Sequence, residues 1–161
     1  MKKEAVYLWN LYFAGEKMAT YKEKVIKAIM EKGMYSCMNN TKWIELKKGV
    51  EVLPFEPPFV VKTVYEEENE SHKFDKDCSY LGDWGDFEGD YIDRLGSDMI
   101  RIPFYAVEWM KVRPRYTKHQ GRLMPDIIAE DVTEDFLAIL KTHNIPYEEE
   151  NGAFIIYGYR T

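Results

Sequence analysis

Hydrophobic side chains recur with the period of an α-helix in two segments of this chain. In the first, Thr20 and Glu23 have the spacing of a capping box, and Gly33 follows the last apolar turn. In the second, Thr133 precedes an acidic first turn, and Asn144 stands where the periodic pattern stops. The pattern predicts a helix in each segment, capped by the threonine and ended by the glycine or the asparagine.

A shorter helix is predicted between them. Asn40 is a favoured N-cap, and residues 47–49 (Lys-Lys-Gly) are typical of a helix end. The proline-rich segment over residues 53–58 cannot continue the helix, because proline lacks the backbone donor. We therefore expect a helix of about two turns here.

Strands are predicted where β-branched and aromatic residues cluster, over residues 59–65, 79–84 and 105–113. Near the C-terminus, Asn151–Gly152 separates two further runs, and both central positions of a type I′ turn need the positive φ that these residues tolerate. This predicts a hairpin over residues 147–159. Glycines divide the segment that follows the second strand, and we expect a loop there.

These elements predict an α+β fold with an antiparallel sheet of four or five strands, a C-terminal β-hairpin, and helices packed on one face. At 161 residues the chain has the size of one domain with its own core. We expect this domain to span residues 18–161, and the mostly apolar residues 1–17 to form an N-terminal extension.

Cysteine content and hydropathy favour a cytoplasmic protein. Cys37 and Cys78 are too few for a disulfide framework in a chain of this size. No apolar run approaches the length of a membrane-spanning helix, and the N-terminus lacks a convincing signal-peptide cleavage site. We expect no membrane association.

Charge is segregated along the chain. Between Glu66 and Asp93, eleven carboxylates stand against two lysines, and from Arg101 to Arg122 six bases stand against one acid, Glu108. Aromatic residues are interleaved with the charges in both stretches, which suits a contact surface as well as a core. The formal net charge of −6 argues against nucleic-acid binding, because phosphate neutralisation needs a basic footprint.

Motifs that would fix a reaction are missing from the sequence. The three histidines have no metal-ligand spacing, and the acidic run over residues 83–90 does not match the pattern of a calcium-binding loop. Cys37 has no histidine near it in sequence, and no nucleophile-elbow motif occurs. We therefore expect no metal and no cofactor, and favour a non-enzymatic protein.

The acidic stretch predicts a surface that engages a basic protein partner, in the manner of small immunity proteins that neutralise cationic toxins. Opposite charge speeds the encounter of such partners. Candidate binding residues are Asp83, Trp84, Asp86 and Asp90 in this stretch, and Trp109 in the basic one. For the tryptophans, the competing interpretation is burial in the core.

The alternative is a small enzyme or binding protein for an anionic small molecule or nucleotide. Arg113, Arg115 and Arg122 would hold the anionic group, because a guanidinium binds carboxylate or phosphate through two hydrogen bonds. The other residues of this site would be Asn39, Asn40 and Trp43. The competing interpretation of the arginines is pairing with the chain's own acidic stretch. A cleft where these residues converge would favour the alternative, and a flat acidic patch would favour the binder.

Several short segments resemble those of a family of small, uncharacterised bacterial proteins, a domain of unknown function. The segments are Met38–Trp43, Leu53–Phe59, Gly82–Trp84, Glu108–Tyr116 and Ile155–Arg160. The resemblance extends from about residue 18 to the C-terminus and leaves the first 17 residues outside. It implies a compact bacterial domain without a known activity, so it supplies no catalytic residues.

Overall fold

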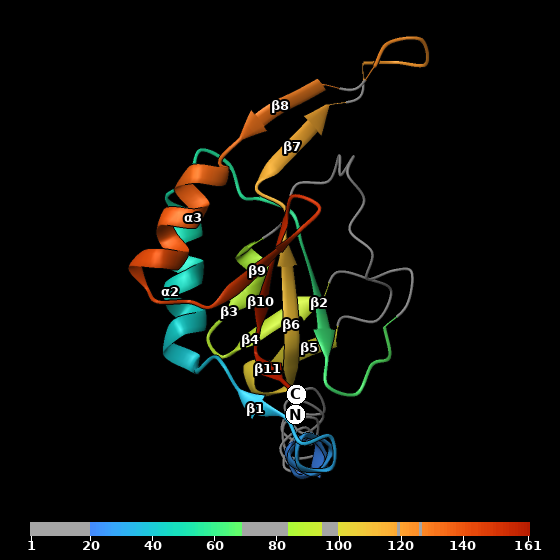
Figure 1. The fold of residues 1–161 in the computed structure, drawn as a ribbon, viewed down its shortest axis with the longest axis vertical. Coiled ribbons are helices and arrows are strands. Elements are labelled where there is room, and N and C mark those ends of the chain that lie inside the picture. The colour runs from blue at the N-terminus through green and yellow to red at the C-terminus, as the bar shows by residue number, and fades with distance from the viewer. Residues whose placement is uncertain (1–19, 69–83, 95–99, 119, 126) are drawn as a thin grey trace, which may run out of the picture.

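A computed structural model gives the chain the predicted α+β fold (Figure 1). The structure describes residues 20–68, 84–94, 100–118, 120–125 and 127–161. Within these residues, no helix is long and apolar enough to cross a membrane.

The described elements follow one another from the helix over residues 20–31 to the C-terminal strand. They continue with β1 (Tyr35–Ser36), α2 (Asn40–Glu51), β2 (Phe59–Thr63), β3 (Phe87–Glu88), β4 (Tyr91–Arg94), β5 (Ile100–Pro103), β6 (Val107–Val112), β7 (Arg115–Lys118), β8 (Ile127–Asp131), α3 (Thr133–Thr142), β9 (Tyr147–Glu150), β10 (Ala153–Tyr157) and β11 (Tyr159–Arg160). Short 3₁₀ turns at Trp84–Asp86 and Phe104–Ala106 precede β3 and β6.

A four-stranded antiparallel sheet with the order β2-β6-β10-β9 forms the centre of the molecule. Helices α2 and α3 pack side by side on one of its faces (Figure 1). Phe136 of α3 lies 5.9 Å from Phe154 of β10 between ring centroids, and both side chains are buried. The helices therefore cover one face of this sheet, as the sequence predicts.

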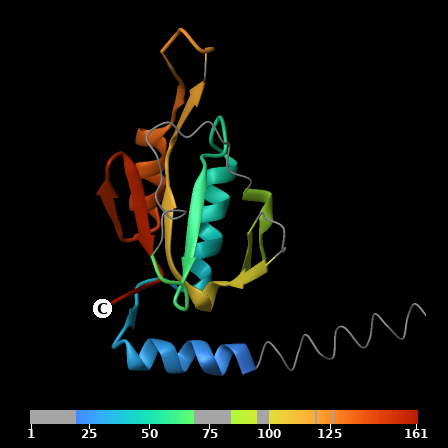
Figure 2. The same cartoon turned by 90° about the vertical axis from the view of Figure 1, so that its right-hand side faces the viewer.

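Three smaller antiparallel sheets surround the central one: β3-β4-β5, β7-β8 and β1-β11. The β7–β8 hairpin projects from one end of the molecule, and the helix over residues 20–31 lies across the other end (Figure 2). Val25 anchors that helix in the core, and Lys32 Nζ donates to the carbonyl of Val64 over 2.5 Å.

The C-terminal ends of the helices follow the predicted chemistry, whereas the predicted N-cap residues of α2 and α3 are each wrong by one position. Gly33 and Asn144 both adopt positive φ, and each ends its helix with a backbone hydrogen bond from the following residue to the carbonyl five residues earlier. The side chain of Asn39, rather than Asn40, caps α2 by accepting from Lys42 N at 2.9 Å. The prediction that Thr133 caps α3 is wrong, because Thr133 is its first residue and the N-cap is Val132, without a side-chain hydrogen bond. Asp131 Oδ1 instead accepts from the N–H of Thr133 at 2.9 Å.

Helix α2 does not end at Gly49 but continues to Glu51, which corrects the predicted boundary. The reason lies in packing against α3. A Cβ atom at Gly49 would lie 2.4 Å from Ile139 Cγ2. Glycine is therefore needed inside α2 for the close approach of the two helices, and its conformational freedom is not used.

Strand predictions are correct for the central sheet, and most of the strands around it were not predicted. The strand over 59–65 is confirmed as Phe59–Thr63, and the strand over 105–113 begins two residues later, at Val107, after the 3₁₀ turn. Most of the predicted strand over 79–84 lies outside the described residues, and Trp84 starts a 3₁₀ turn. The expected loop that follows contains β3 and β4, so that prediction is wrong.

Aromatic rings join the central sheet to the β3-β4-β5 sheet. The Trp84 ring lies 4.9 Å from Phe59 and 5.6 Å from Phe87 between centroids, and Phe87 lies 5.1 Å from Phe104. Trp43 of α2 completes the cluster at 6.0 Å from Phe104. Tilted rings at these distances pack well, so Trp84 and Phe87, two aromatics of the acidic stretch, build core.

Candidate functional site

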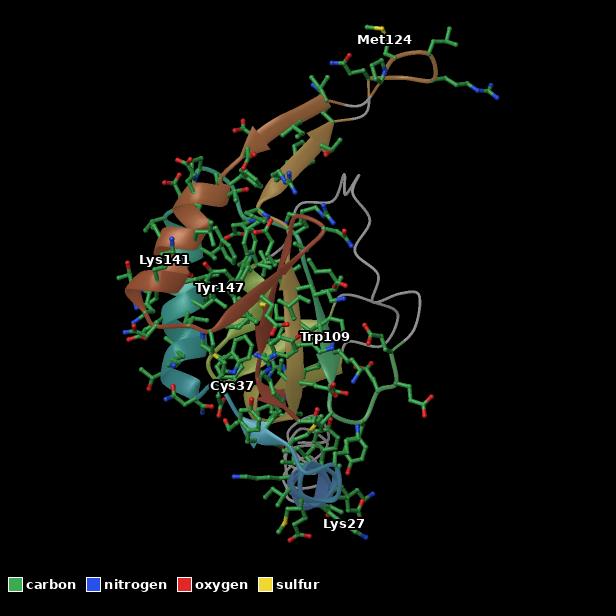
Figure 3. The ribbon with its side chains drawn as sticks, viewed as in Figure 1. Lys27, Cys37, Trp109, Met124, Lys141 and Tyr147 are labelled. Atoms are coloured by element: carbon green, nitrogen blue, oxygen red, sulfur yellow. The ribbon has the colours of Figure 1, made fainter. Side chains whose placement is uncertain are left out.

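The face of the central sheet that points away from the helices carries charged and aromatic side chains. The register pairs Trp109 with both Lys62 and Tyr157, and it pairs Lys111 with Ile155. Because side chains alternate along a strand, these five residues lie on the face opposite the core residues of the same strands. Figure 3 shows Trp109 on this sheet.

Glu108 joins the same face because strand β6 carries a β-bulge. The register shifts between Lys62, which pairs with Trp109, and Thr63, which pairs with Val107, so Glu108 is the extra residue of the bulge. Lys62 Nζ lies 2.5 Å from Glu108 Oε2, and the Lys62 side chain is 6% exposed. The bulge thus holds a largely buried ion pair at the base of this face.

A groove of about 490 Å³ runs over this face and reaches strand β9. Its lining contains one lysine, Lys111, together with Trp109, Ile155 and Tyr157. The five carboxylates of the lining are Glu68, Glu108, Glu148, Glu149 and Glu150. The groove is therefore strongly acidic, with an aromatic and aliphatic base, and we call it the acidic groove.

Lys111 bridges two sides of the acidic groove. Its Nζ lies 3.8 Å from Glu68 Oε1, 3.5 Å from Glu150 Oε2 and 4.7 Å from the centroid of the Trp109 ring. Glu68 and Glu150 are 67% and 58% exposed, so water screens both pairs and each contributes little to stability. These two carboxylates are available to an incoming cation.

Tyr157 and Arg160 converge on Glu148 at the other end of the groove. The Tyr157 hydroxyl donates to Glu148 Oε2 over 3.1 Å, and Arg160 forms an ion pair with the same carboxylate. Burial raises the pKa of Tyr157, and the hydrogen bond to Glu148 raises it further. The phenol therefore stays protonated and acts as a donor at neutral pH.

A second depression, of about 510 Å³, lies where α3 begins. Its lining includes Arg115 and the carboxylates of Asp131, Glu134, Asp135 and Glu149. We call this second hollow the acidic depression. Glu149 lines both the acidic groove and the acidic depression.

Strand β9 separates the acidic groove from the acidic depression. It stands at the end of the strand order, so among the described residues nothing pairs with its outer edge. Figure 2 places the β9–β10 hairpin at the margin of the molecule. Sequence analysis missed Glu148, Glu149 and Glu150, although three consecutive glutamates in a predicted hairpin strand were the signal for them.

The tryptophan candidates are divided between core and groove. Trp43 and Trp84 are 1% and 0% exposed, so the structure places them in the core rather than on a contact surface. Trp84 Nε1 donates to the carbonyl of Pro57 over 2.7 Å, which satisfies the only polar atom of the side chain. Trp109, at 5% exposure, lines the acidic groove.

The acidic candidates are less fully described. Asp83 lies outside the described residues, and the side chain of Asp86 is likewise not described. Asp90 is exposed in the turn between β3 and β4, where its carbonyl accepts from Phe104 N at 2.9 Å. A surface built from these three residues stays a prediction.

Two of the three candidate arginines bind the turn of the C-terminal hairpin. Arg113 is 2% exposed, and its Nη1 lies 3.4 Å from the carbonyl of Asn151. Arg115 Nη2 donates to the carbonyl of Gly152 over 3.1 Å. Both guanidinium groups therefore support the fold at this turn.

The residues of the alternative anion site do not converge. Arg122 is exposed in the loop between β7 and β8, the loop whose tip is marked by Met124 in Figure 3. Asn39 and Asn40 lie near β1, at the opposite end of the molecule, beside a small cavity of about 90 Å³. The cleft that would favour this alternative is not formed by the described residues.

A metal centre finds no support in the part of the chain that the structure describes. No group of three or more His, Cys, Asp or Glu side chains there is placed to hold a metal ion. Cys37 is a free thiol among the described residues, and burial is the main cause that raises its pKa.

Fold and site together define a small α+β domain with an acidic groove beside a free sheet edge. The chain belongs to a family of unknown function, DUF6678, whose model matches residues 25–161. Comparison with the curated proteins and with the solved structures found no match. The match begins at Val25, so a domain boundary at residue 18 and an extension over residues 1–17 stay predictions.

Proposed function

We propose that this chain is a non-enzymatic, acidic protein-binding module, immunity-protein-like in its chemistry, that captures a basic protein partner. The observation that carries the proposal is the charge around the β9–β10 hairpin. The linings of the acidic groove and the acidic depression hold eight carboxylates and two basic side chains, Lys111 and Arg115. Two further bases pair with these carboxylates: Lys62 with Glu108 and Arg160 with Glu148. Even with both included, eight acids stand against four bases.

Surplus carboxylates of this kind favour association more than folding. Exposed ion pairs contribute about 0–1 kcal/mol each to stability, whereas a field of one sign raises the rate at which an oppositely charged partner arrives. The aromatic and aliphatic base of the groove adds surface that a partner would bury. Trp109 and Tyr157 are residue types enriched where partners anchor.

The test uses a defined basic probe and a matched pair of variants. The probe is a synthetic dodecapeptide that alternates lysine and threonine, and its affinity is measured by calorimetry at low and high salt. Glu68→Gln combined with Glu150→Gln should weaken binding about threefold to tenfold at low salt, because two screened charge contacts are lost. High salt should remove most of the difference.

Glu31→Gln combined with Glu51→Gln is the control, since it makes the same change in net charge. Glu31 is 67% exposed and Glu51 is 47% exposed, and each pairs with a lysine on its own helix, outside the groove. The control double variant should bind the peptide like the unmodified chain. Equal weakening by both double variants would mean that net charge alone attracts the peptide. Failure of the unmodified chain to bind the peptide at low salt would reject the proposed function.

A further inference from the structure

We infer that the free edge of β9 receives an extended basic segment of the partner as an added fifth strand of the central sheet. This inference rests on the proposed function and specifies how the partner binds: through its backbone as well as its charge. Strand addition at an exposed edge is a common mode of peptide recognition, in which main-chain hydrogen bonds give affinity and alternate side chains give specificity.

Register determines which backbone groups of β9 face outward. Asn151 and Gly152 have φ of 51° and 75°, as a type I′ turn requires, and they separate the paired residues Glu150 and Ala153. The turn closes with a hydrogen bond between that pair, so the next pair, Glu149 with Phe154, is a non-hydrogen-bonded one. The N–H and C=O groups of Glu149 therefore point away from β10.

Hydrogen-bonded and non-hydrogen-bonded pairs continue to alternate along the rest of β9. Glu148 forms a hydrogen-bonded pair with Ile155, and Tyr147 forms a non-hydrogen-bonded pair with Ile156. Tyr147 and Glu149 thus present two outward donors and two outward acceptors. Outward groups on every second residue are what a further antiparallel or parallel strand needs for pairing.

Side chains on both faces of β9 select the charge of that strand. Glu148 and Glu150 lie in the acidic groove on one face of the sheet. On the other face, Glu149 lies in the acidic depression with Glu134 and Asp135. An added strand places its own side chains alternately over the two hollows, so lysine or arginine on either face meets carboxylates.

Charged residues on an edge strand also have a protective role, since they discourage unwanted pairing with other strands. Glutamates repel acidic strands and disfavour neutral ones, because pairing would desolvate the carboxylates, yet they attract a basic strand. Discrimination of this kind combines attraction to one partner with repulsion of the others. A purely protective edge and a receptive one make different predictions for backbone pairing with a basic peptide.

The experiment compares Glu149→Pro with Glu149→Gln, using the lysine–threonine dodecapeptide. Both variants lose the same charge, but only proline removes the outward N–H, and it leaves the hydrogen bonds to β10 intact. We expect Glu149→Gln to bind the peptide within about threefold of the unmodified chain and Glu149→Pro to bind at least about tenfold more weakly. Thermal unfolding of both variants reports whether the fold is kept.

A second probe keeps the test decisive if the proline variant is unstable. It is the same dodecapeptide with every backbone nitrogen methylated, which preserves charge and removes the donors. The inference expects at least about tenfold weaker binding of this analogue to the unmodified chain. Equal affinity for the two peptides would overturn strand addition and leave the proposed function standing. Binding of neither peptide would reject both.

Discussion

The hairpins β9–β10 and β7–β8 differ in how their strands are stabilised. In β9–β10, a two-residue turn joins the strands, and β10 is buried between β9 and β6, with Ile156 at 0% exposure. In β7–β8, residues 119–126 connect the strands, and Leu123 and Ile128 are 97% and 59% exposed. The first hairpin is held by a local turn and by the core, whereas the second pairs in a sheet of its own.

The difference shows why the candidate site belongs to the first hairpin. A strand that offers its edge to a partner must itself be held in register, and β10 fixes β9 through four paired positions. The β7–β8 hairpin has an irregular register at Tyr116/Thr117 and forms a two-stranded sheet, an arrangement that is marginally stable when isolated. Strand β9 is therefore both held in register by β10 and lined with glutamates.

The largest expected effect contrasts two isoleucines. Ile156→Ala should lower the free energy of unfolding by about 2–5 kcal/mol, because it leaves a cavity in the core. Ile128→Ala, the same change in the exposed hairpin, should alter it by less than about 0.5 kcal/mol. Urea denaturation measures both. Comparable losses would show that β7–β8 is part of the cooperative core.

A smaller effect is expected at two glycines with positive φ. Gly152 has φ of +75°, and a Cβ there would lie 1.7 Å from Arg115 Nη2. Gly152→Ala should therefore cost about 1–3 kcal/mol, because left-handed strain adds to displacement of the arginine. Gly121 in the other hairpin has φ of +115° but open space around it, so Gly121→Ala should cost less. Denaturation curves that rank the two in the opposite order would contradict this account of the turn.

Sequence analysis predicted the first hairpin and missed the second for physical reasons. Asn151–Gly152 determines its turn locally, since few other dipeptides tolerate two positive φ values in succession. No turn signal of that strength lies between β7 and β8. Their residues also lack the strict alternation of a sheet with one buried face, because Ile127 and Ile128 are both exposed.

Local sequence signals also predict only part of the candidate site. Trp43 and Trp84 were indistinguishable in sequence from exposed aromatics, because only tertiary packing decides which rings are buried. Glu108 reaches the acidic groove through a bulge that no periodic pattern predicts. The acidic stretch over residues 66–93 contributes one carboxylate to the acidic groove, Glu68, whereas the other four come from β6 and β9, far away in sequence.

The smallest expected effect concerns alkaline pH and the Tyr157–Glu148 contact across β9–β10. Because the folded state raises the pKa of Tyr157, the folded chain holds this proton more tightly than the unfolded one. The stabilisation is complete below the ordinary tyrosine pKa of about 10 and is lost as pH rises through the higher folded value. Tyr157→Phe should make the alkaline loss of stability shallower, by less than about 1 kcal/mol. Urea denaturation at neutral and alkaline pH measures the change, and an unaltered slope would mean that other groups dominate it.

The central claim is that β9 offers a receptive edge, and amide hydrogen exchange tests it most directly. In the free protein, the amides of Tyr147 and Glu149 should exchange quickly, and those of Glu148 and Glu150 slowly, because only the latter two are bonded to β10. Saturation with the lysine–threonine dodecapeptide should slow exchange at Tyr147 and Glu149 selectively. Unchanged exchange at these two amides, with the peptide bound, would contradict the claim.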